Sequence, residues 1–272
     1  MDEIVRGECE PLQLLFTSAP EVNLERVYQE APAARLVNGL VKEVTTAAVE
    51  LWPAGWTLRA LEIGAGTGST TSLLLPCLPV GRTEYIFTDI SQLFLINAQR
   101  KFRQHGFVSY ELLDIERAPA AQGFAGRWFD LVVAANVLHA TSDIRRTLRH
   151  VRQLMAPGGL LVLTEGIGRQ RAADLMFGLL KGWWNFTDRE LRRDHPLLSP
   201  GLWLGVLEEE GFDGAAALPA VGSEDEQYFQ QALILARATK GGAEAGSVAA
   251  SAAVEPPLLQ QDFEAGGDVY TR

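Results

Sequence analysis

Cysteine is scarce in this chain, which carries only Cys9 and Cys77 among 272 residues. Two cysteines so far apart provide neither a disulfide framework nor the spacing of metal ligands, so we expect a reduced, cytoplasmic protein without a metal site. No apolar run approaches the roughly 20 residues that span a bilayer, and no secretory leader is recognisable at the start of the sequence. These scarcities argue against disulfide-rich and membrane-embedded proteins.

Basic residues are fewer than acidic ones, 24 against 34, which gives a formal net charge of -10. A chain with this charge repels nucleic acids and anionic membrane surfaces at long range. We therefore expect neither a nucleic acid nor a membrane as a partner. The hydrophobic content of 47% is ample for a substantial core, and the length suits one large α/β domain with tails.

What the chain does contain is a glycine-rich loop directly after an apolar run. Residues 60–69 read ALEIGAGTGS, with glycine at positions 64, 66 and 68. This pattern predicts a buried strand that turns sharply into a helix starting near Ser69. Glycines and unpaired helix amides allow a ligand to approach the backbone closely, although a plain tight turn is the alternative.

The spacing of these glycines favours one kind of ligand. Dinucleotide-binding loops carry G-x-G-x-x-G, whereas here Ser69 occupies the last position and the third glycine comes one residue early. A nicotinamide oxidoreductase is therefore disfavoured. A ligand without a diphosphate fits better, with its amino-acid end over the glycines and the Glu62 carboxylate beside it, because a charge inside an apolar strand needs a partner.

The rest of the chain alternates strands and helices, which is typical of a doubly wound α/β fold with a parallel sheet. Helical spacing broken by Pro32 predicts two helices within residues 23–51. Later strands are predicted at 83–90, 108–113, 129–135, 160–164 and 228–236, and helices at 70–75, 92–104, 143–155, 172–184 and 200–210. We expect one domain over residues 1–238, with an N-terminal helical segment to about residue 56, and a flexible Ala/Gly-rich tail over 239–272.

Acidic residues end two of the predicted strands. Asp89 lies about twenty residues beyond the glycine loop, where a carboxylate can bind a ribose diol or cap the next helix. Asp114 can accept a hydrogen bond from an adenine amino group while Ile115 lies against the ring, or it can cap a loop.

His139 and Glu165 follow the fourth and fifth predicted strands. If these strands are neighbours, their backbones lie about 4.8 Å apart and the two side chains can hydrogen-bond. A carboxylate on one imidazole nitrogen fixes the tautomer and stabilises the charge that appears when the other nitrogen takes a proton. The pair is a candidate general base, and a histidine satisfied within the core is the alternative.

Several segments resemble the methyltransferase domains embedded in modular polyketide synthases, over roughly residues 10–237. The segments that carry the resemblance are the glycine loop, TDIS, LLDIE, NVLHATSD, APGGLLVLTEG, FGLLKGWWNF and DHPLLS. The resemblance implies a Rossmann-like class I methyltransferase sheet of seven strands with the last one reversed, N-terminal helices as a partial lid, and S-adenosylmethionine as cofactor. It implies cofactor contacts at Glu62, Gly64, Ala65, Gly66, Gly68, Asp89, Ile90, Asp114, Ile115 and Asn136, and catalysis by His139 and Glu165.

The resemblance also implies an acyl substrate carried by an acyl carrier protein, with neighbouring polyketide synthase domains as partners. We predict O-methylation of a β-hydroxyl, because the carbon-methylating branch generally has a long N-terminal lid and only some sixty residues precede the glycine loop here. Methylation of the α-carbon of a β-ketoacyl chain and a degenerate structural domain are the alternatives.

Four residues are candidate substrate contacts, namely Tyr28, Asn38, Trp183 and Trp184. The two tryptophans, with Phe186, either cover a substrate tunnel or pack in the core. A row of arginines at 145, 149 and 152 shares one helix face and either docks the acidic carrier protein or forms an ordinary solvated surface.

Overall fold

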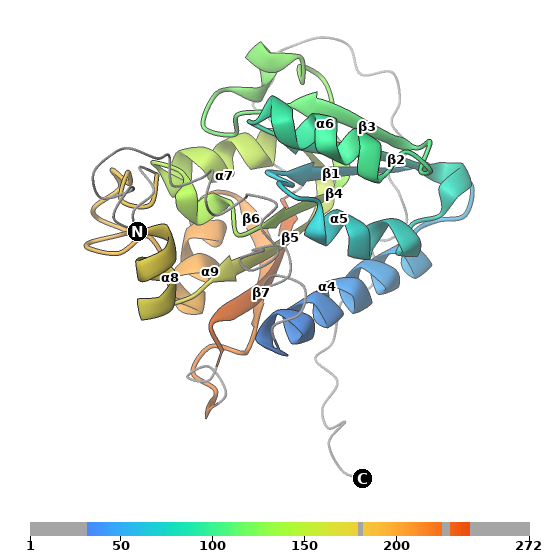
Figure 1. The fold of residues 1–272 in the computed structure, drawn as a ribbon. Helices are drawn as coiled ribbons and strands as arrows, with labels where there is room; N and C mark the ends of the chain where they lie inside the picture. Colours follow the sequence, from blue (N-terminus) through green and yellow to red (C-terminus); the bar gives the residue numbers. More distant parts are fainter. Residues whose placement is uncertain (1–31, 179–181, 225–228, 240–272) are drawn as a thin grey trace.

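A computed structural model of the 272-residue chain describes residues 32–178, 182–224 and 229–239. The first described element is the helix α4 (Pro32–Leu51), drawn in blue in Figure 1. Tyr28, the helix expected before Pro32 and the tail expected beyond residue 239 lie outside the described residues. Within the described ranges, no helix combines the length and apolarity that crossing a membrane requires.

Seven strands form one mixed sheet in the order β3-β2-β1-β4-β5-β7-β6. Their bounds are β1 (Leu58–Ile63), β2 (Thr83–Asp89), β3 (Val108–Leu112), β4 (Phe129–Ala135), β5 (Met155–Gly166), β6 (Phe212–Leu218) and β7 (Gln231–Ala238). Strands β1 to β5 are parallel, and β7 runs antiparallel to both β5 and β6. This topology confirms the doubly wound class I methyltransferase fold with a reversed last strand.

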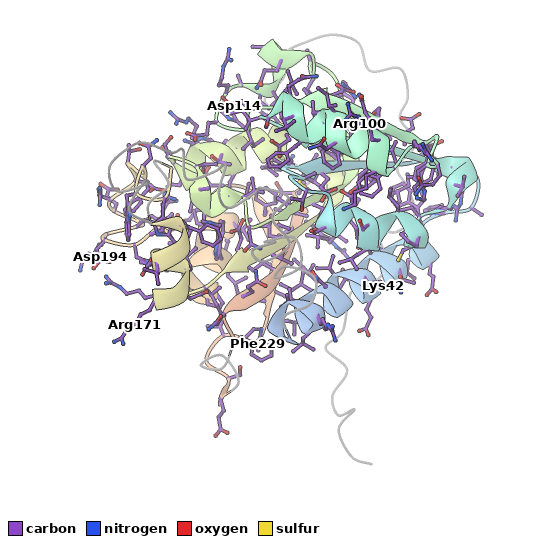
Figure 2. The ribbon with its side chains drawn as sticks, in the orientation of Figure 1. Lys42, Arg100, Asp114, Arg171, Asp194 and Phe229 are labelled. Carbon is purple, nitrogen blue, oxygen red and sulfur yellow. The ribbon has the colours of Figure 1, made fainter. Side chains whose placement is uncertain are left out.

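Helices cover both faces of the sheet and bury the side chains that alternate along its strands (Figures 1 and 2). The remaining helices are α5 (Ser69–Leu74), α6 (Gln92–Lys101), α7 (Ile144–Gln153), α8 (Arg171–Phe177) and α9 (Pro200–Glu209). One core cluster joins the sheet to α4, α5 and α6 through residues such as Val41, Leu74 and Leu95. A second joins it to α7 and α9 through Leu148 and the fully buried Trp203.

Some predicted helices end earlier in the structure, and one strand was not predicted. The helix expected over 172–184 corresponds to α8, which ends at Phe177, and residues 182–184 form a turn. The helix expected over 143–155 ends at Gln153, because Met155 already pairs with Phe129 and the following Ala-Pro-Gly-Gly belongs to β5. A register irregularity in β4 accommodates this segment. Strand β6 was not predicted, because its sequence FDGAAAL is poor in the β-branched residues that usually indicate a strand.

The arginine row of α7 is occupied within the domain. Arg145 pairs with Glu209, and Arg149 pairs with Glu210 at 3.0 Å, so both connect α7 to the end of α9. Arg152 donates to the carbonyl oxygen of Gly211 at 3.1 Å and to that of Thr239. The row is therefore a partly exposed seam, in which each arginine has an acidic or carbonyl partner on α9 or next to the last strands.

Candidate active site

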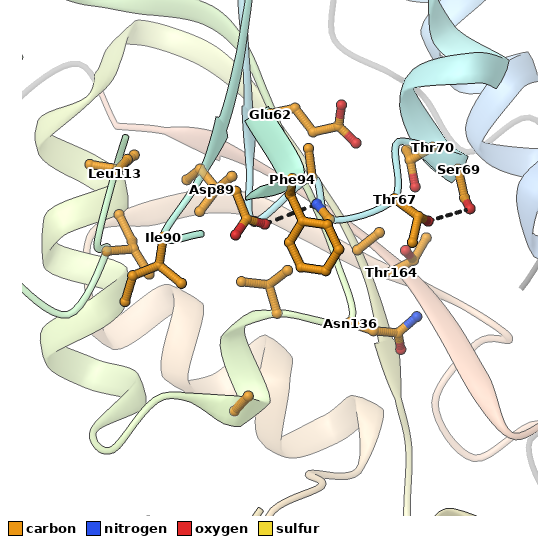
Figure 3. A pocket seen from close by; sticks show the side chains of 18 of the residues that line it. Glu62, Thr67, Ser69, Thr70, Asp89, Ile90, Phe94, Leu113, Asn136 and Thr164 are labelled. Atoms are coloured by element: carbon orange, nitrogen blue, oxygen red, sulfur yellow. Dashed lines mark hydrogen bonds between the residues drawn. The ribbon is translucent and has the colours of Figure 1, made fainter. Parts of the chain in front are cut away.

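A cavity of about 440 Å³ lies above the glycine loop at the carboxyl ends of the parallel strands (Figure 3). Its lining includes every predicted cofactor position except Gly68. The predicted positions that line it are Glu62, Gly64, Ala65, Gly66, Asp89, Ile90, Asp114, Ile115 and Asn136. Asn38, a candidate substrate contact on α4, also lines it.

The three glycines of the loop are needed for different reasons. All have positive φ, but a β-carbon on Gly64 would lie 2.7 Å from the methyl groups of Val137, and one on Gly68 would lie 2.6 Å from the ring of Phe102. Only Gly66 faces open space, with no atom nearer than 3.9 Å. Gly68 therefore allows α5 to pack closely against Phe102 at the end of α6, and among the three glycines it is the one that does not line the cavity.

Glu62 is a buried carboxylate at the floor of the cavity, with 1% of its surface exposed. The hydroxyls of Thr71 and Tyr85 both donate to its Oε2 at 2.5 Å. Burial raises the pKa of Glu62 to about 7, although these two hydrogen bonds favour the charged form. A cationic group in the cavity would stabilise the carboxylate further, so this residue suits the ammonium of an amino-acid ligand.

Asp89 connects the second strand to the glycine loop. Its Oδ2 accepts from the Gly66 amide at 2.9 Å, drawn as a dashed line in Figure 3, and its Oδ1 accepts from the Ser91 amide at 2.8 Å. Burial raises the pKa of Asp89, while these two amides oppose the shift. Each carboxylate oxygen keeps a second lone pair, so the side chain can hold the loop and still accept from a ribose hydroxyl.

Asp114 and two isoleucines form the part of the lining expected to surround an adenine. Asp114 accepts from the Glu116 amide at 3.0 Å through Oδ1. Ile115 is buried, whereas Ile90 is 70% exposed at the rim. An apolar side chain this exposed beside a cavity is suited to being covered when a flat ring binds.

Asn136 has the left-handed backbone that L residues seldom adopt, with φ of 55°. Its amide donates to the Thr164 carbonyl oxygen at 2.7 Å, and its Oδ1 accepts from Gln231 Nε2 at 3.0 Å. Thr164 and Gln231 also line the cavity, and sequence analysis identified neither as a site residue. The amide of Gln231 is brought to the site by β7, which pairs with β5 over a long sequence separation.

His139 and Glu165 form the predicted contact. The register of β4 and β5 pairs Ala135 with Thr164, so Glu165 near the end of β5 lies beside the turn that follows β4. His139 lies on the single 3-10 turn η4 (Leu138–Ala140), and its Nδ1 is 2.5 Å from Glu165 Oε2. Glu165 Oε1 accepts from the backbone amides of Val137 at 3.2 Å and Leu138 at 2.8 Å.

These bonds orient the imidazole. Because a carboxylate on Nδ1 selects the tautomer with its proton there, Nε2 is left as the acceptor. No described residue hydrogen-bonds to Nε2. Neither His139 nor Glu165 lines the cavity among the described residues, but Val137, Ala140 and Thr164 beside them do. The pair thus lies next to the cavity rather than in its wall.

The tryptophans predicted to contact substrate lie on the His139 side. Trp183 is buried and meets the His139 ring edge to face, with ring centroids 5.5 Å apart. Its Nε1 donates to Asp174 Oδ1 at 3.1 Å, and His195 Nε2 lies 3.0 Å from the same oxygen. Trp184 is 45% exposed. Neither tryptophan lines the cavity in the described part of the chain.

Comparisons with known proteins agree with this geometry. A family model described as a methyltransferase domain matches residues 61–161. Polyketide synthase ThaG of Burkholderia thailandensis is 40% identical over 219 residues, 79% of this chain and 4% of that protein. Highly reducing polyketide synthase FUM1 of Gibberella moniliformis is 36% identical over 250 residues, 89% of this chain and 9% of that protein.

Solved structures agree as well. The CurJ carbon methyltransferase is 48% identical with a TM-score of 0.82, over 87% of this chain and 63% of that one. The trans-methyltransferase CalH, in complex with SAH, is 34% identical with a TM-score of 0.70, over 87% of this chain and 64% of that one. These matches identify the chain as a methyltransferase domain similar to those of polyketide synthases.

The methyltransferase domain is an enzyme that uses S-adenosylmethionine, and its cavity fits that cofactor. The Glu62 carboxylate suits the amino-acid part of the cofactor, and the open Gly66 suits its sulfur centre. The strand-terminal acids Asp89 and Asp114, with their apolar neighbours, suit the adenosine. No group of three or more metal-ligating side chains that could hold an ion occurs among the described residues.

The raised pKa of Glu62 predicts a pH-dependent affinity for the cofactor product. Binding of S-adenosylhomocysteine, measured by calorimetry, should weaken roughly tenfold from pH 8 to pH 6, because the carboxylate that faces the ligand's ammonium becomes protonated near pH 7. The stability of the ligand-free domain should have the opposite pH dependence. The native state holds this proton more tightly than the unfolded chain, so the contribution of Glu62 to stability is lost as pH rises through about 7. The variant Glu62→Gln should show neither trend, and an unchanged slope in that variant would contradict the assignment.

Alanine substitutions at Gly66 and Gly68 should affect different properties, because only Gly66 faces the cavity and Gly68 faces Phe102. Gly66→Ala places a methyl group on the cavity wall and should weaken S-adenosylhomocysteine binding with a modest loss of stability, about 1 kcal/mol from the positive φ. Gly68→Ala has the same strain plus a clash with Phe102, and should lower the melting temperature more. Melting curves with and without ligand separate the two effects. Equal losses of affinity in both variants would refute the distinction.

Proposed function

We propose that this domain methylates the α-carbon of a β-ketoacyl thioester carried by an acyl carrier protein. The observation that carries the proposal is the His139–Glu165 pair, whose orientation leaves Nε2 as a base beside the cavity. Two solved relatives, from CurJ at 48% identity and DszA at 36%, are carbon methyltransferases. Carbon methylation needs such a base, because an α-proton between two carbonyl groups must be removed before the carbon is nucleophilic.

The sequence-based prediction of O-methylation depends on the small number of residues before the glycine loop. That number cannot discriminate between the two reactions, since the chain spans 63% of the CurJ domain and 62% of the DszA domain. An O-methyltransferase family protein from Burkholderia thailandensis shares the fold at 16% identity, which shows nothing about the reaction. O-methylation of a β-hydroxyl stays the alternative.

In the proposed mechanism each residue has a separate task. When bound in the cavity, S-adenosylmethionine would supply an electrophilic methyl group, with S-adenosylhomocysteine as the product. His139 Nε2 takes the proton from the substrate's α-carbon, and Glu165 stabilises the imidazolium through Nδ1. Glu62, Gly66, Asp89 and Asp114 would hold the methyl donor. The electron pair left on the α-carbon forms the new bond to the methyl group, and the imidazolium then releases its proton to solvent.

The relatives suggest the partners that we propose, and the end of β7 gives the proposed domain boundary. The chain spans between 4% and 10% of the length of the curated synthases that it matches, so a carrier protein and neighbouring synthase domains are proposed partners. We place the domain end at Ala238, where β7 ends. Trp183 and Asn38 are proposed substrate contacts, since one touches His139 and the other lines the cavity.

In the test, the domain is incubated in parallel with β-ketoacyl and β-hydroxyacyl carrier proteins, and mass spectrometry locates the added methyl group. We expect α-methylation of the β-ketoacyl chain, a loss of about 10²- to 10⁴-fold in rate for His139→Ala, and unchanged S-adenosylhomocysteine binding in that variant. His105→Ala is a matched control, because His105 meets the Phe107 ring edge to face beside the edge strand β3.

Methylation of the β-hydroxyl alone would establish the O-methylating alternative. A normal rate in His139→Ala would refute the assignment of the base. Failure of the wild-type domain to bind S-adenosylhomocysteine would favour the degenerate domain.

A further inference from the structure

A completely buried arginine contacts the turn that carries His139. The side chain of Arg192 is 0% exposed, and it lies in the segment between α8 and α9. We propose that Arg192 is a positioning residue for His139. It binds the carboxyl end of η4, the catalytic turn, while Glu165 binds its amino end. This inference rests on the proposed role of His139 as the base.

Both terminal nitrogens of the guanidinium bind the turn. One donates to the His139 carbonyl oxygen at 2.7 Å, and the other donates to the Thr141 carbonyl oxygen at 2.8 Å. A turn of only three residues has little hydrogen bonding of its own, and carbonyl groups at its end need outside donors. The flat, forked guanidinium satisfies two carbonyls at a fixed separation, which a lysine ammonium cannot reproduce.

The guanidinium is itself fixed in place. Its Nε donates to Asp188 Oδ1 at 2.6 Å, and the ring of Phe186 lies 5.1 Å from the guanidinium carbon. Asp188 Oδ2 accepts from the Ile144 amide at 3.0 Å, at the start of α7. The clamp therefore connects the catalytic turn, the first turn of α7 and the segment after Trp184.

Glu165 and Arg192 bind complementary backbone groups of this turn. Glu165 accepts from the amides of Val137 and Leu138, whereas Arg192 donates to carbonyls at 139 and 141. The turn is thus held at both ends, so the backbone of His139 cannot rotate without breaking charge-assisted hydrogen bonds.

A purely stabilising role explains this arrangement less well. Burying a charge has a large desolvation cost, and an apolar side chain of similar volume often stabilises a fold equally. Here the two terminal nitrogens go to the backbone around the base, which favours a role in placing the imidazole. Misplacement of a catalytic group by about 1 Å can reduce the rate on the order of 10²-fold.

The test compares Arg192→Lys with Arg189→Lys. Arg189 lies over the same Phe186 ring at 4.4 Å but donates to the Arg193 carbonyl oxygen and not to the catalytic turn. We expect Arg192→Lys to lower kcat about ten- to a hundredfold, with KM and S-adenosylhomocysteine affinity within about twofold of wild type. Arg189→Lys should leave all three unchanged.

A spectroscopic readout separates positioning from general damage. Nitrogen-15 spectra of the imidazole should show a single His139 tautomer in the wild type and a mixture in Arg192→Lys. If that variant does not fold, Asp188→Asn keeps Arg192 and loosens its anchor, and the same kcat loss is expected.

A folded Arg192→Lys with wild-type kcat and one tautomer would overturn the inference. The parallel His139→Ala variant identifies the cause: if it remains active the proposed base is wrong, whereas if it is inactive only the role of Arg192 is rejected.

Discussion

The carboxylate of Glu165 has 0% of its surface exposed and is surrounded by donors from the end of the neighbouring strand. It accepts from two backbone amides and from the His139 ring, so the cost of burying the charge is offset by charge-assisted hydrogen bonds. This is possible because β4 and β5 are parallel neighbours in a register that pairs Ala135 with Thr164. The orientation of the base depends on that pairing.

The turn η4, which carries His139, lies between the cofactor cavity and the aromatic cluster around Trp183. The left-handed backbone of Asn136 redirects the chain as it leaves β4, so Val137 and Ala140 face the cavity while His139 meets Trp183. Strained backbone of this kind persists where surrounding contacts hold it, and here Thr164 and Gln231 bind Asn136. The methyl-donor side is built mainly on the ends of β1, β2 and β3, and the base side on the ends of β4 and β5 and the segment after α8.

Much of the site was predictable because motifs at strand ends depend on local chain geometry. Asp89, Asp114, His139 and Glu165 follow predicted parallel strands, and such residues meet at one edge of the sheet. Contacts made over long sequence separations were not predictable. Examples are the Phe102 ring that explains Gly68, the Glu209 partner of Arg145 and the reach of Arg192 to the catalytic turn. Nothing in the local pattern near these residues identifies the partner.

A crystal structure of the domain with S-adenosylhomocysteine and a β-ketoacyl pantetheine thioester tests the central claim most directly. The account predicts S-adenosylhomocysteine over Gly66, the Glu165 contact intact, and His139 Nε2 directed at the substrate's α-carbon at a near-attack separation of about 3 to 3.5 Å. An α-carbon bound elsewhere, with Nε2 turned away from it or bonded to the protein, would contradict the account.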